Sequence, residues 1–255
     1  MTYIDYILDL FKNTPRQGPG STAESLQALA LMDLPNEALT IADIGCGSGN
    51  ATLTLAQNTQ SKITAVDLFP EFLNQLEINA DKVGLIDQIQ TLKASMDQLP
   101  FEKNTFDMIW SEGAIYNMGF KKGTKQWRKF LKPKGYLAVS EITWTTNDRP
   151  KELNDFWNEA YPEIDTAANK IKVLEENGYR LVGYFYLKPD SWIKNYYEPL
   201  ALEFDAFLQK HDHSEDAKAI VKEQIEEFEL YKNYQDYYSY GFYVAQKIIK
   251  TPSSN

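Results

Sequence analysis

Residues 40–50 read Thr40-Ile41-Ala42-Asp43-Ile44-Gly45-Cys46-Gly47-Ser48-Gly49-Asn50, an apolar strand pattern that runs into three alternating glycines. Glycine accepts a positive φ and has no Cβ to keep a ligand away from the backbone. The next residues, 51–56, predict a helix whose unpaired amide groups and positive dipole end face the same loop. The pattern predicts a ligand-binding loop, and the alternative is an ordinary tight turn between a strand and a helix.

A second acid stands where a nucleoside would need it. Residues 63–66 predict a second strand, and Asp67 ends it 22 positions after Gly45. An acid at about this spacing can hold ribose hydroxyls. The loop reads D-x-G-x-G-x-G, whereas dinucleotide sites use G-x-G-x-x-G. Asp43, directly before the loop, would repel a pyrophosphate but attract an ammonium group.

The combined pattern resembles the S-adenosylmethionine loop of class I methyltransferases. The resemblance implies that the glycine loop, with Asn50 after it, lies along the methionine part of this cofactor. It also implies that Asp43 helps to hold the amino group, and that Asp67, with Leu68 beside it, takes the ribose.

Residues 94–101 are similar to the third motif of the same family, which is written G-D-A-x-x-L-P-F. By position, Ser95 and Met96 stand where the family's Asp-Ala pair meets the adenine ring. Ser95 replaces an acid that would bind the exocyclic amine, and Asp97 is the residue that can supply this role instead. Leu99 and Phe101 are equally consistent with core residues after a turn.

Two further segments are expected at the mouth of the site. The turn from Arg16 to Gly20 would fold over the cofactor, with Arg16 meeting a methionine carboxylate, or would simply link two helices. The fourth predicted strand, 106–112, ends in Ser111 and Glu112, and ligands of open α/β sheets bind beyond the carboxyl ends of the strands. We therefore predict Ser111 and Glu112 at the cofactor and Glu112 at the chemistry, unless Glu112 only pairs with Arg16 or a lysine. The next catalytic candidates, just after the turn, are Tyr116 and Asn117.

Strands that alternate with helices from Thr40 to Glu141 predict an α/β fold with parallel pairing and right-handed crossovers. Later strands are expected at 179–187 and 237–247. The resemblance implies a doubly wound sheet of seven strands in the order 3-2-1-4-5-7-6, the last antiparallel, with helices on both faces and a helical cap. We expect one methyltransferase domain over 1–255: an N-terminal helical lip (1–35), a cofactor-binding core (36–145), and the remaining strands with the inserted cap (146–255).

The charge and the absence of targeting signals narrow the partners. With 26 Lys and Arg against 36 Asp and Glu, the net charge is −10, which opposes binding to nucleic acid or to an anionic membrane surface. Seven basic residues between 121 and 134 are read as a solvated helix face. The N-terminal residues lack the basic flank of a signal peptide, and no apolar run approaches the length of a membrane span. We expect a cytoplasmic protein that is a monomer or a homodimer.

The second half of the chain is rich in aromatic residues. Between Trp144 and Tyr243 lie 21 of the 34 aromatic residues, more than a closing sheet needs. Such residues serve either as core or as pocket lining. The best-placed candidates for substrate binding are Trp144, Trp192, Tyr196 and Tyr197. Ten acids against three lysines in 198–230 predict a solvated outer face for the cap.

Several reaction classes lack their chemistry. After the fourth strand the chain reads Ser111-Glu112-Gly113-Ala114, not the N-P-P-Y of amino-methylating DNA enzymes. Methylation of a base at C5 needs a nucleophilic cysteine, and the one cysteine, Cys46, lies inside the glycine loop. No metal is expected, because His211-Asp212-His213 offers only two imidazoles. Outer segments such as R-Q-G-P-G-S and S-E-I-T-W resemble a bacterial small-molecule subgroup similar to the ubiquinone/menaquinone C-methyltransferase type. The prediction is methyl transfer from S-adenosylmethionine to a small acceptor. The alternatives are a non-catalytic S-adenosylmethionine-binding protein and a nicotinamide-dependent oxidoreductase.

Overall fold

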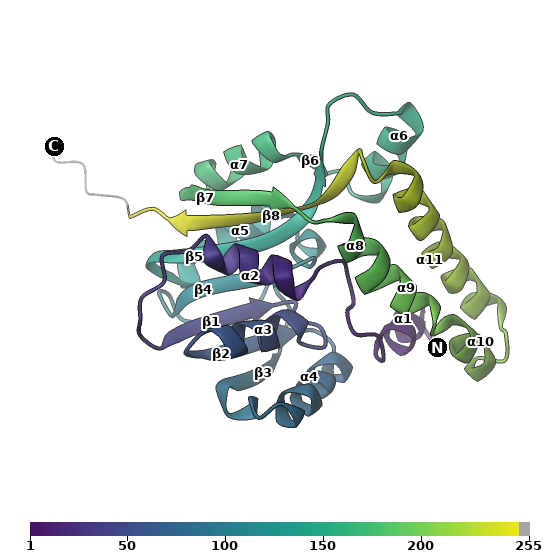
Figure 1. Ribbon diagram of the computed structural model, residues 1–255, viewed down its shortest axis with the longest axis horizontal. Helices are drawn as coiled ribbons and strands as arrows, with labels where there is room; N and C mark the ends of the chain where they lie inside the picture. The colour runs from purple at the N-terminus through teal and green to yellow at the C-terminus, as the bar shows by residue number, and fades with distance from the viewer. Residues whose placement is uncertain (250–255) are drawn as a thin grey trace.

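A sheet of seven long strands lies at the centre of the molecule. Figure 1 shows its arrangement in a computed structural model, which describes residues 1–249. The strand order is β3-β2-β1-β4-β5-β8-β7, and a two-residue strand, β6, pairs with the end of β5. β8 runs antiparallel to both of its neighbours, β5 and β7, and the other strands run parallel to one another. Because the short β6 takes one number, β7 and β8 are the sixth and seventh strands of the predicted order 3-2-1-4-5-7-6. The predicted doubly wound sheet, its strand order and its antiparallel last strand are confirmed. The bounds are β1 Leu39–Ile44, β2 Ser61–Asp67, β3 Ile89–Lys93, β4 Phe106–Glu112, β5 Leu131–Trp144, β6 Asp165–Thr166, β7 Tyr179–Tyr186 and β8 Tyr238–Lys247.

Helices cover both faces of the sheet. One buried cluster joins α2, α3 and α4 to one face, and a second joins α5 and α7 to the other. The central strands are apolar throughout because both of their faces are covered, as is usual for parallel strands. The bounds of these helices are α2 Thr22–Ala30, α3 Asn50–Asn58, α4 Pro70–Lys82, α5 Phe120–Trp127 and α7 Ala167–Glu176.

The remaining helices gather at the carboxyl ends of the parallel strands, on the right of Figure 1. α1 packs against α10 and α11, and a π-helical turn, Ile193–Tyr197, joins α8 to α9. We call α8 to α11 with this turn the cap. The expected helical cap is present: two short helices, α9 and α10, precede the long α11, whose first turn is capped by Ser214. The bounds are α1 Tyr3–Phe11, α6 Lys151–Ala160, α8 Pro189–Trp192, α9 Glu198–Ala201, α10 Phe204–Lys210 and α11 Glu215–Tyr234.

An aromatic cluster joins the cap to the sheet. Trp192 stacks on Tyr231 with 4.4 Å between ring centroids, and its indole N–H donates to the hydroxyl of Ser239. Trp144 and Tyr197 belong to the same cluster. Aromatic pairs add about 0.5–1.5 kcal/mol beyond the area they bury. Most of the aromatic excess in the second half of the chain is therefore core.

The first residues of β5 are irregular. β5 begins at Leu131 and pairs with Phe106, and its register with β4 shifts before Met108. Lys134 takes a positive φ of 64° at this irregularity. The strand continues through this irregularity, as a strand does at a β-bulge, where it accommodates an extra residue.

Candidate functional site

A cavity of about 750 Å³ opens at the carboxyl ends of β1, β2 and β4, within the size range of small-molecule sites. Its walls come from the glycine loop, the segments after β2, β3 and β4, the N-terminal segment and the cap helix α11. The cavity therefore lies at the carboxyl ends of the strands, where the sequence predicted that a ligand binds. The predicted site residues that line this cavity are Arg16, Asp43, Gly45, Gly47, Asn50, Asp67, Leu68, Ser95, Met96, Asp97, Glu112, Tyr116, Asn117 and Tyr196.

The glycine loop needs its glycines. Gly45, Gly47 and Gly49 all have positive φ, at 74°, 53° and 92°. A Cβ on Gly45 would lie 2.4 Å from the side chain of Ala114, so the loop passes too close to the segment after β4 for any side chain. Gly49 does not line the cavity: it begins α3, and a Cβ there would strike Leu76 at 2.1 Å.

Asp67 ends β2 and faces the loop. One of its carboxylate oxygens accepts the N–H of Gly47 at 2.9 Å, and the other accepts the N–H of Phe69 at 3.0 Å. Burial raises the pKa of this carboxyl above its ordinary value, and the backbone hydrogen bonds oppose that shift. An ionised carboxylate has about four acceptor positions, so two remain for a ligand's hydroxyls.

Asp43 lies beneath the loop and is 1% exposed. The hydroxyl of Thr52 donates to it at 2.6 Å. Burial, with smaller contributions from the charges of Glu112 and Asp67, raises its pKa to about 7. A positively charged group in the cavity would relieve this cost, because it favours the ionised form of a buried acid.

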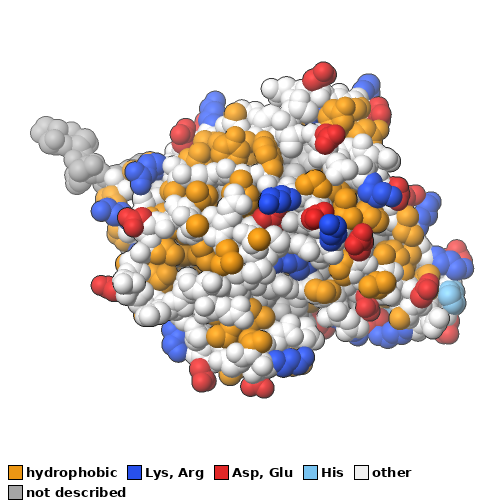
Figure 2. All heavy atoms as spheres, viewed as in Figure 1, with side chains coloured by type: hydrophobic (Ala, Val, Ile, Leu, Met, Phe, Trp, Pro, Cys, Tyr) orange, Lys and Arg blue, Asp and Glu red, His pale blue; other side chains and the backbone are white. Residues whose placement is uncertain are grey.

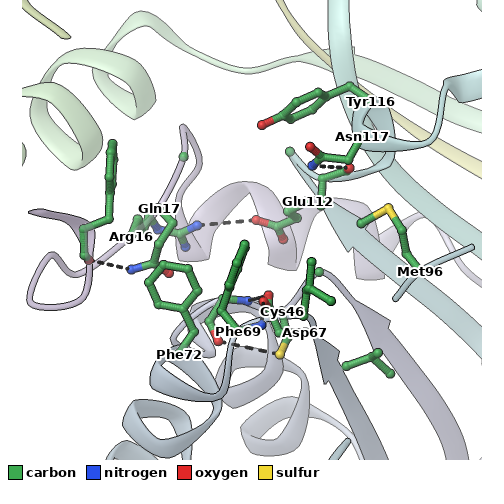
Figure 3. A pocket seen from close by; sticks show the side chains of 18 of the residues that line it. Arg16, Gln17, Cys46, Asp67, Phe69, Phe72, Met96, Glu112, Tyr116 and Asn117 are labelled. Carbon is green, nitrogen blue, oxygen red and sulfur yellow. Dashed lines mark hydrogen bonds and ion pairs between the residues drawn. The ribbon is translucent and has the colours of Figure 1, made fainter. Parts of the chain in front are cut away.

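Glu112, at the end of β4, is held by three donors. Its carboxylate accepts from the hydroxyl of Ser25 at 2.6 Å, from the indole N–H of Trp110 at 2.9 Å, and from the guanidinium of Arg16 at 3.4 Å. Figure 3 shows the Arg16 and Glu112 side chains pointing toward one another across the cavity. The pairing alternative raised for Glu112 is therefore present, and the residue also lines the cavity.

Arg16 keeps one nitrogen free. Its second terminal nitrogen, Nη2, is buried without a hydrogen-bond partner among residues 1–249. A buried, unpaired guanidinium nitrogen is costly, which makes it a ready donor to an anion such as a ligand carboxylate. This nitrogen is available to bind the carboxylate of an amino acid.

The N-terminal segment lies over the glycine loop. The side-chain carbonyl of Gln17 accepts the N–H of Ser48 at 2.8 Å, and its amide nitrogen donates to the carbonyl oxygens of Phe11 and Thr14. Asn50 donates to the carbonyl oxygen of Pro15. The segment that holds the 16–20 turn joins α1 to α2, as the linker alternative has it, and it also contacts the glycine loop, as the other alternative expects.

The segment after β3 forms another wall. The Ser95 hydroxyl donates to Asp97 at 2.6 Å, and the indole N–H of Trp127 holds the carbonyl oxygen of Met96 at 2.9 Å. The hydrogen bond from Ser95 is the main reason that the pKa of Asp97 lies below its ordinary value. Asp97 thus stands as a charged acceptor in the wall where the resemblance expects the adenine amine.

Six predicted site residues lie outside the cavity wall. Trp144, Trp192 and Tyr197 are at most 3% exposed and belong to the aromatic core, so their prediction as substrate-binding residues is not supported. Ser111 is buried and donates to the carbonyl oxygen of Ile44, which ties β4 to β1. Gly20 and Gly49 shape the backbone beside the cavity without lining it.

Several lining residues escaped sequence reasoning. They share no motif, and they reach the cavity from α1, from the start of α4 and from α11; they are Tyr3, Ile7, Phe11, Phe69, Phe72, Gln224 and Glu227. The i, i+4 spacing of Ile7 and Phe11 gave a signal for a buried helix face but not for what that face contacts. Figure 3 shows Phe69 and Phe72 beside Asp67, with Tyr116 and Asn117 across the cavity.

Other kinds of site are not seen in the described part of the chain. No group of three or more His, Cys, Asp and Glu side chains lies within reach of one metal ion among residues 1–249. None of the helices over this range combines the length and the apolar character that a membrane span requires. On the face seen in Figure 2, basic and acidic side chains are interspersed, so that face presents no uniformly basic surface to nucleic acid.

Residues 41–135 match the family model described as a methyltransferase domain. Among curated relatives, the sterol 4-C-methyltransferase strm-1 of Caenorhabditis elegans is 32% identical over 122 residues, which cover 45% of this chain and 34% of that protein. The ubiquinone/menaquinone biosynthesis C-methyltransferase of Rickettsia prowazekii is 26% identical over 134 residues, or 50% of this chain and 54% of that one. The first relatives are matched over only 24–60% of their own length.

The fold has close counterparts among solved structures. A methyltransferase from Geobacter sulfurreducens, solved with S-adenosyl-L-homocysteine, superposes with a TM-score of 0.82 over 94% of this chain and 97% of its own, at 16% sequence identity. The predicted resemblance to class I S-adenosylmethionine-dependent methyltransferases is confirmed by the family match, and the class I fold by the superposition.

Proposed function

We propose, from its class I S-adenosylmethionine-dependent methyltransferase domain, that this protein transfers the methyl group of S-adenosylmethionine to a small-molecule acceptor. The observation that carries the proposal is the arrangement of groups around one cavity. A glycine loop, a ribose-type acid, a buried acid and an unpaired guanidinium nitrogen all meet there. S-adenosylmethionine supplies, when bound, an electrophilic methyl group on a sulfonium.

The residues present fit the parts of this cofactor. Asp67 has acceptor positions left for the ribose hydroxyls, and Asp43 is a buried acid that gains by facing an ammonium group. The free nitrogen of Arg16 suits the methionine carboxylate. Leu68 would lie beside the ribose, and Ser95, Met96 and Asp97 would meet the adenine, the last as the acceptor for its amine.

On the acceptor side we propose Glu112, Tyr116, Asn117 and Tyr196. Glu112 lies at the end of β4, which is hydrogen-bonded to β1, and its three donors fix the direction of its carboxylate. Fixed groups lower a displacement barrier mainly by holding nucleophile, methyl carbon and sulfur in line in a site that excludes water. Cavity-facing aromatic rings such as Tyr196 help to exclude that water.

The wider assignment follows the same reasoning. The partner is a small molecule and not nucleic acid or a membrane, because the chain is acidic overall. We propose one domain, with a lip at 1–35, a cofactor core at 36–145 and the remaining strands and cap at 146–255, in a cytoplasmic monomer or homodimer.

Two alternatives remain in different classes. A non-catalytic protein would bind S-adenosylmethionine and leave every acceptor unchanged. A nicotinamide-dependent oxidoreductase would use the same loop for a pyrophosphate, which Asp43 disfavours by its position under the loop.

The test has two steps. Calorimetric titration with S-adenosylhomocysteine and, separately, with NAD should give heat and saturation only for the first; binding of NAD alone would reject the proposal. Incubation with S-adenosylmethionine labelled on its methyl group and a broad metabolite panel should then yield a labelled product. Tight cofactor binding with no product from any acceptor class would favour the non-catalytic alternative.

A further inference from the structure

The end of the cavity formed by the cap has a chemistry that the cofactor does not use. Gln224 and Glu227 reach it from the same face of α11, three residues apart, and Tyr196 and Tyr116 line it beside them. Glu227 is half-buried although most of the cap's acids are exposed. The predicted solvated acidic face of the cap therefore has one carboxylate turned inward.

Glu227 is only partly satisfied. One carboxylate oxygen accepts the hydroxyl of Tyr197 at 2.8 Å. The other makes no hydrogen bond within residues 1–249, and no cationic side chain in that range forms an ion pair with this residue. Gln224, only 8% exposed, has a buried amide oxygen that also lacks a partner. A buried acceptor normally has a partner, so the Gln224 oxygen points to a ligand that donates. The second Glu227 oxygen is accessible and not buried, and it is a further free acceptor on the same wall.

Acidic side chains outnumber basic ones in the wall of the cavity. Five acids line it, Asp43, Asp67, Asp97, Glu112 and Glu227, against the two cations Arg16 and Lys122. Arg16 is paired with Glu112, and Lys122 acts on Asp97 in the opposite wall. Asp43, Asp67 and Glu227 have no cationic partner among residues 1–249, and of these three only Glu227 comes from the cap and not from the cofactor loop or the end of β2.

Aromatic rings surround this carboxylate. Burial is the main reason that Tyr116 and Tyr196 have a raised pKa, and the charge of Glu227 raises the pKa of both further. The hydroxyls of both tyrosines therefore lie close enough to Glu227 to feel its charge. Burial likewise raises the pKa of Glu227 itself. A carboxylate among tyrosine faces is the arrangement that binds organic cations, since the ring faces carry negative potential.

We propose that the cap end of the cavity, formed by Glu227, Gln224, Tyr116 and Tyr196, binds the ammonium group of the methyl acceptor, so that the acceptor is a small amine. This inference rests on the proposed function, because it treats the cap end as the acceptor's place. Glu227 supplies the counter-charge, the Gln224 amide oxygen accepts a hydrogen bond from an N–H or O–H group of the acceptor, and the tyrosine rings contact the cation. Where this nitrogen is the atom methylated, the ammonium first gives a proton to Glu227, and the freed lone pair then takes the methyl group as its bond to sulfur breaks and S-adenosylhomocysteine leaves. An anionic acceptor would meet an unpaired carboxylate and be repelled.

Choline and 3,3-dimethylbutan-1-ol test the site directly, because they have the same shape and differ in charge. Neither needs to react, so the measurement is binding: calorimetric titration of each into the protein alone and into the protein saturated with S-adenosylhomocysteine. We expect choline to bind at least about tenfold more tightly than the neutral alcohol. Equal binding of the two probes, or no choline binding in the millimolar range, would overturn the proposal.

Glu227→Gln keeps the side chain's shape and an oxygen for the Tyr197 hydroxyl, so the fold should persist, and circular dichroism checks this. The variant should lose the preference for choline. Glu226→Gln, on the exposed side of the same helix, where Glu226 faces Lys222, is the matched control and should keep it. A folded Glu227→Gln protein that still prefers choline would refute the assignment. Absence of S-adenosylhomocysteine binding in the wild type would instead reject the proposed function.

Discussion

Replacing Asp67 tests the cofactor site most directly. In the structure this carboxylate already binds the N–H groups of Gly47 and Phe69, so it serves both the loop and the two acceptor positions that remain for ribose hydroxyls. Asp67→Asn preserves the shape and one acceptor oxygen, but it presents an NH₂ donor to groups that also donate. Hydrogen bonds to charged groups contribute about 1.5–3 kcal/mol each, so the loss of two corresponds to about 3–6 kcal/mol, or roughly 10²- to 10⁴-fold in affinity.

The fold should survive this change. Burial makes the ionised form of Asp67 unfavourable, as its raised pKa shows, and an amide removes that cost while it weakens the hold on the loop. Calorimetry with S-adenosylhomocysteine, beside thermal melts by circular dichroism, separates the two effects. Asp87→Asn, at an exposed position outside the cavity, is the matched control. Asp67→Ala removes the loop contacts as well and should be at least as damaging. A folded Asp67→Asn protein whose affinity stays within about threefold of wild type would refute the assignment of this residue.

Three further changes test other parts of the site. Gly47→Val should abolish S-adenosylhomocysteine binding, because the φ of Gly47 is +53° and a Cβ would lie 2.4 Å from the side-chain carbonyl oxygen of Gln17. Normal binding by a folded variant, measured by calorimetry, would show that the loop is only a turn. The pKa of Asp43, about 7 in the fold against an ordinary 3.8, predicts that its contribution to apo stability falls as pH rises from about 4 to 7, since only the folded form still holds the proton. Cofactor affinity should therefore increase up to about pH 7 and then level off, and calorimetry across pH 5–8 should find this dependence absent in Asp43→Asn. Glu112→Gln should lower turnover at least about tenfold with little change in cofactor affinity, once the metabolite panel supplies an acceptor; an equal loss of both would mean that Glu112 only positions Arg16.

The parts of the site that sequence predicted are those in which local chemistry and position coincide. The glycine loop and Asp67 are set by strand ends and by backbone conformations that few residues adopt, so their spacing alone placed them at the cavity. The strand order followed from a family resemblance over the same region. These predictions needed no knowledge of how distant segments pack.

The aromatic residues show where that reasoning stops. Trp192 and Tyr196 lie four residues apart in one short segment, yet Trp192 stacks in the core and Tyr196 lines the cavity. A π-helical turn begins directly after Trp192 and includes Tyr196, and π-helical turns change which way successive side chains face. Helical periodicity could not foresee this change, nor could composition distinguish Glu227 from the exposed acids around it, because both depend on how the helices of the cap pack against one another.

The N-terminal segment connects the two halves of the site physically. Toward the cofactor side it binds the glycine loop through Gln17 and Ser48. Toward the cap, the N–H of Gly20 donates to the carbonyl oxygen of Ser191, and Asn195 donates to the carbonyl oxygen of Gly20. Arg16 lies between these attachments and reaches Glu112. A displacement of this segment would therefore disturb its contacts with both the glycine loop and the cap, because one short stretch of backbone is attached to each.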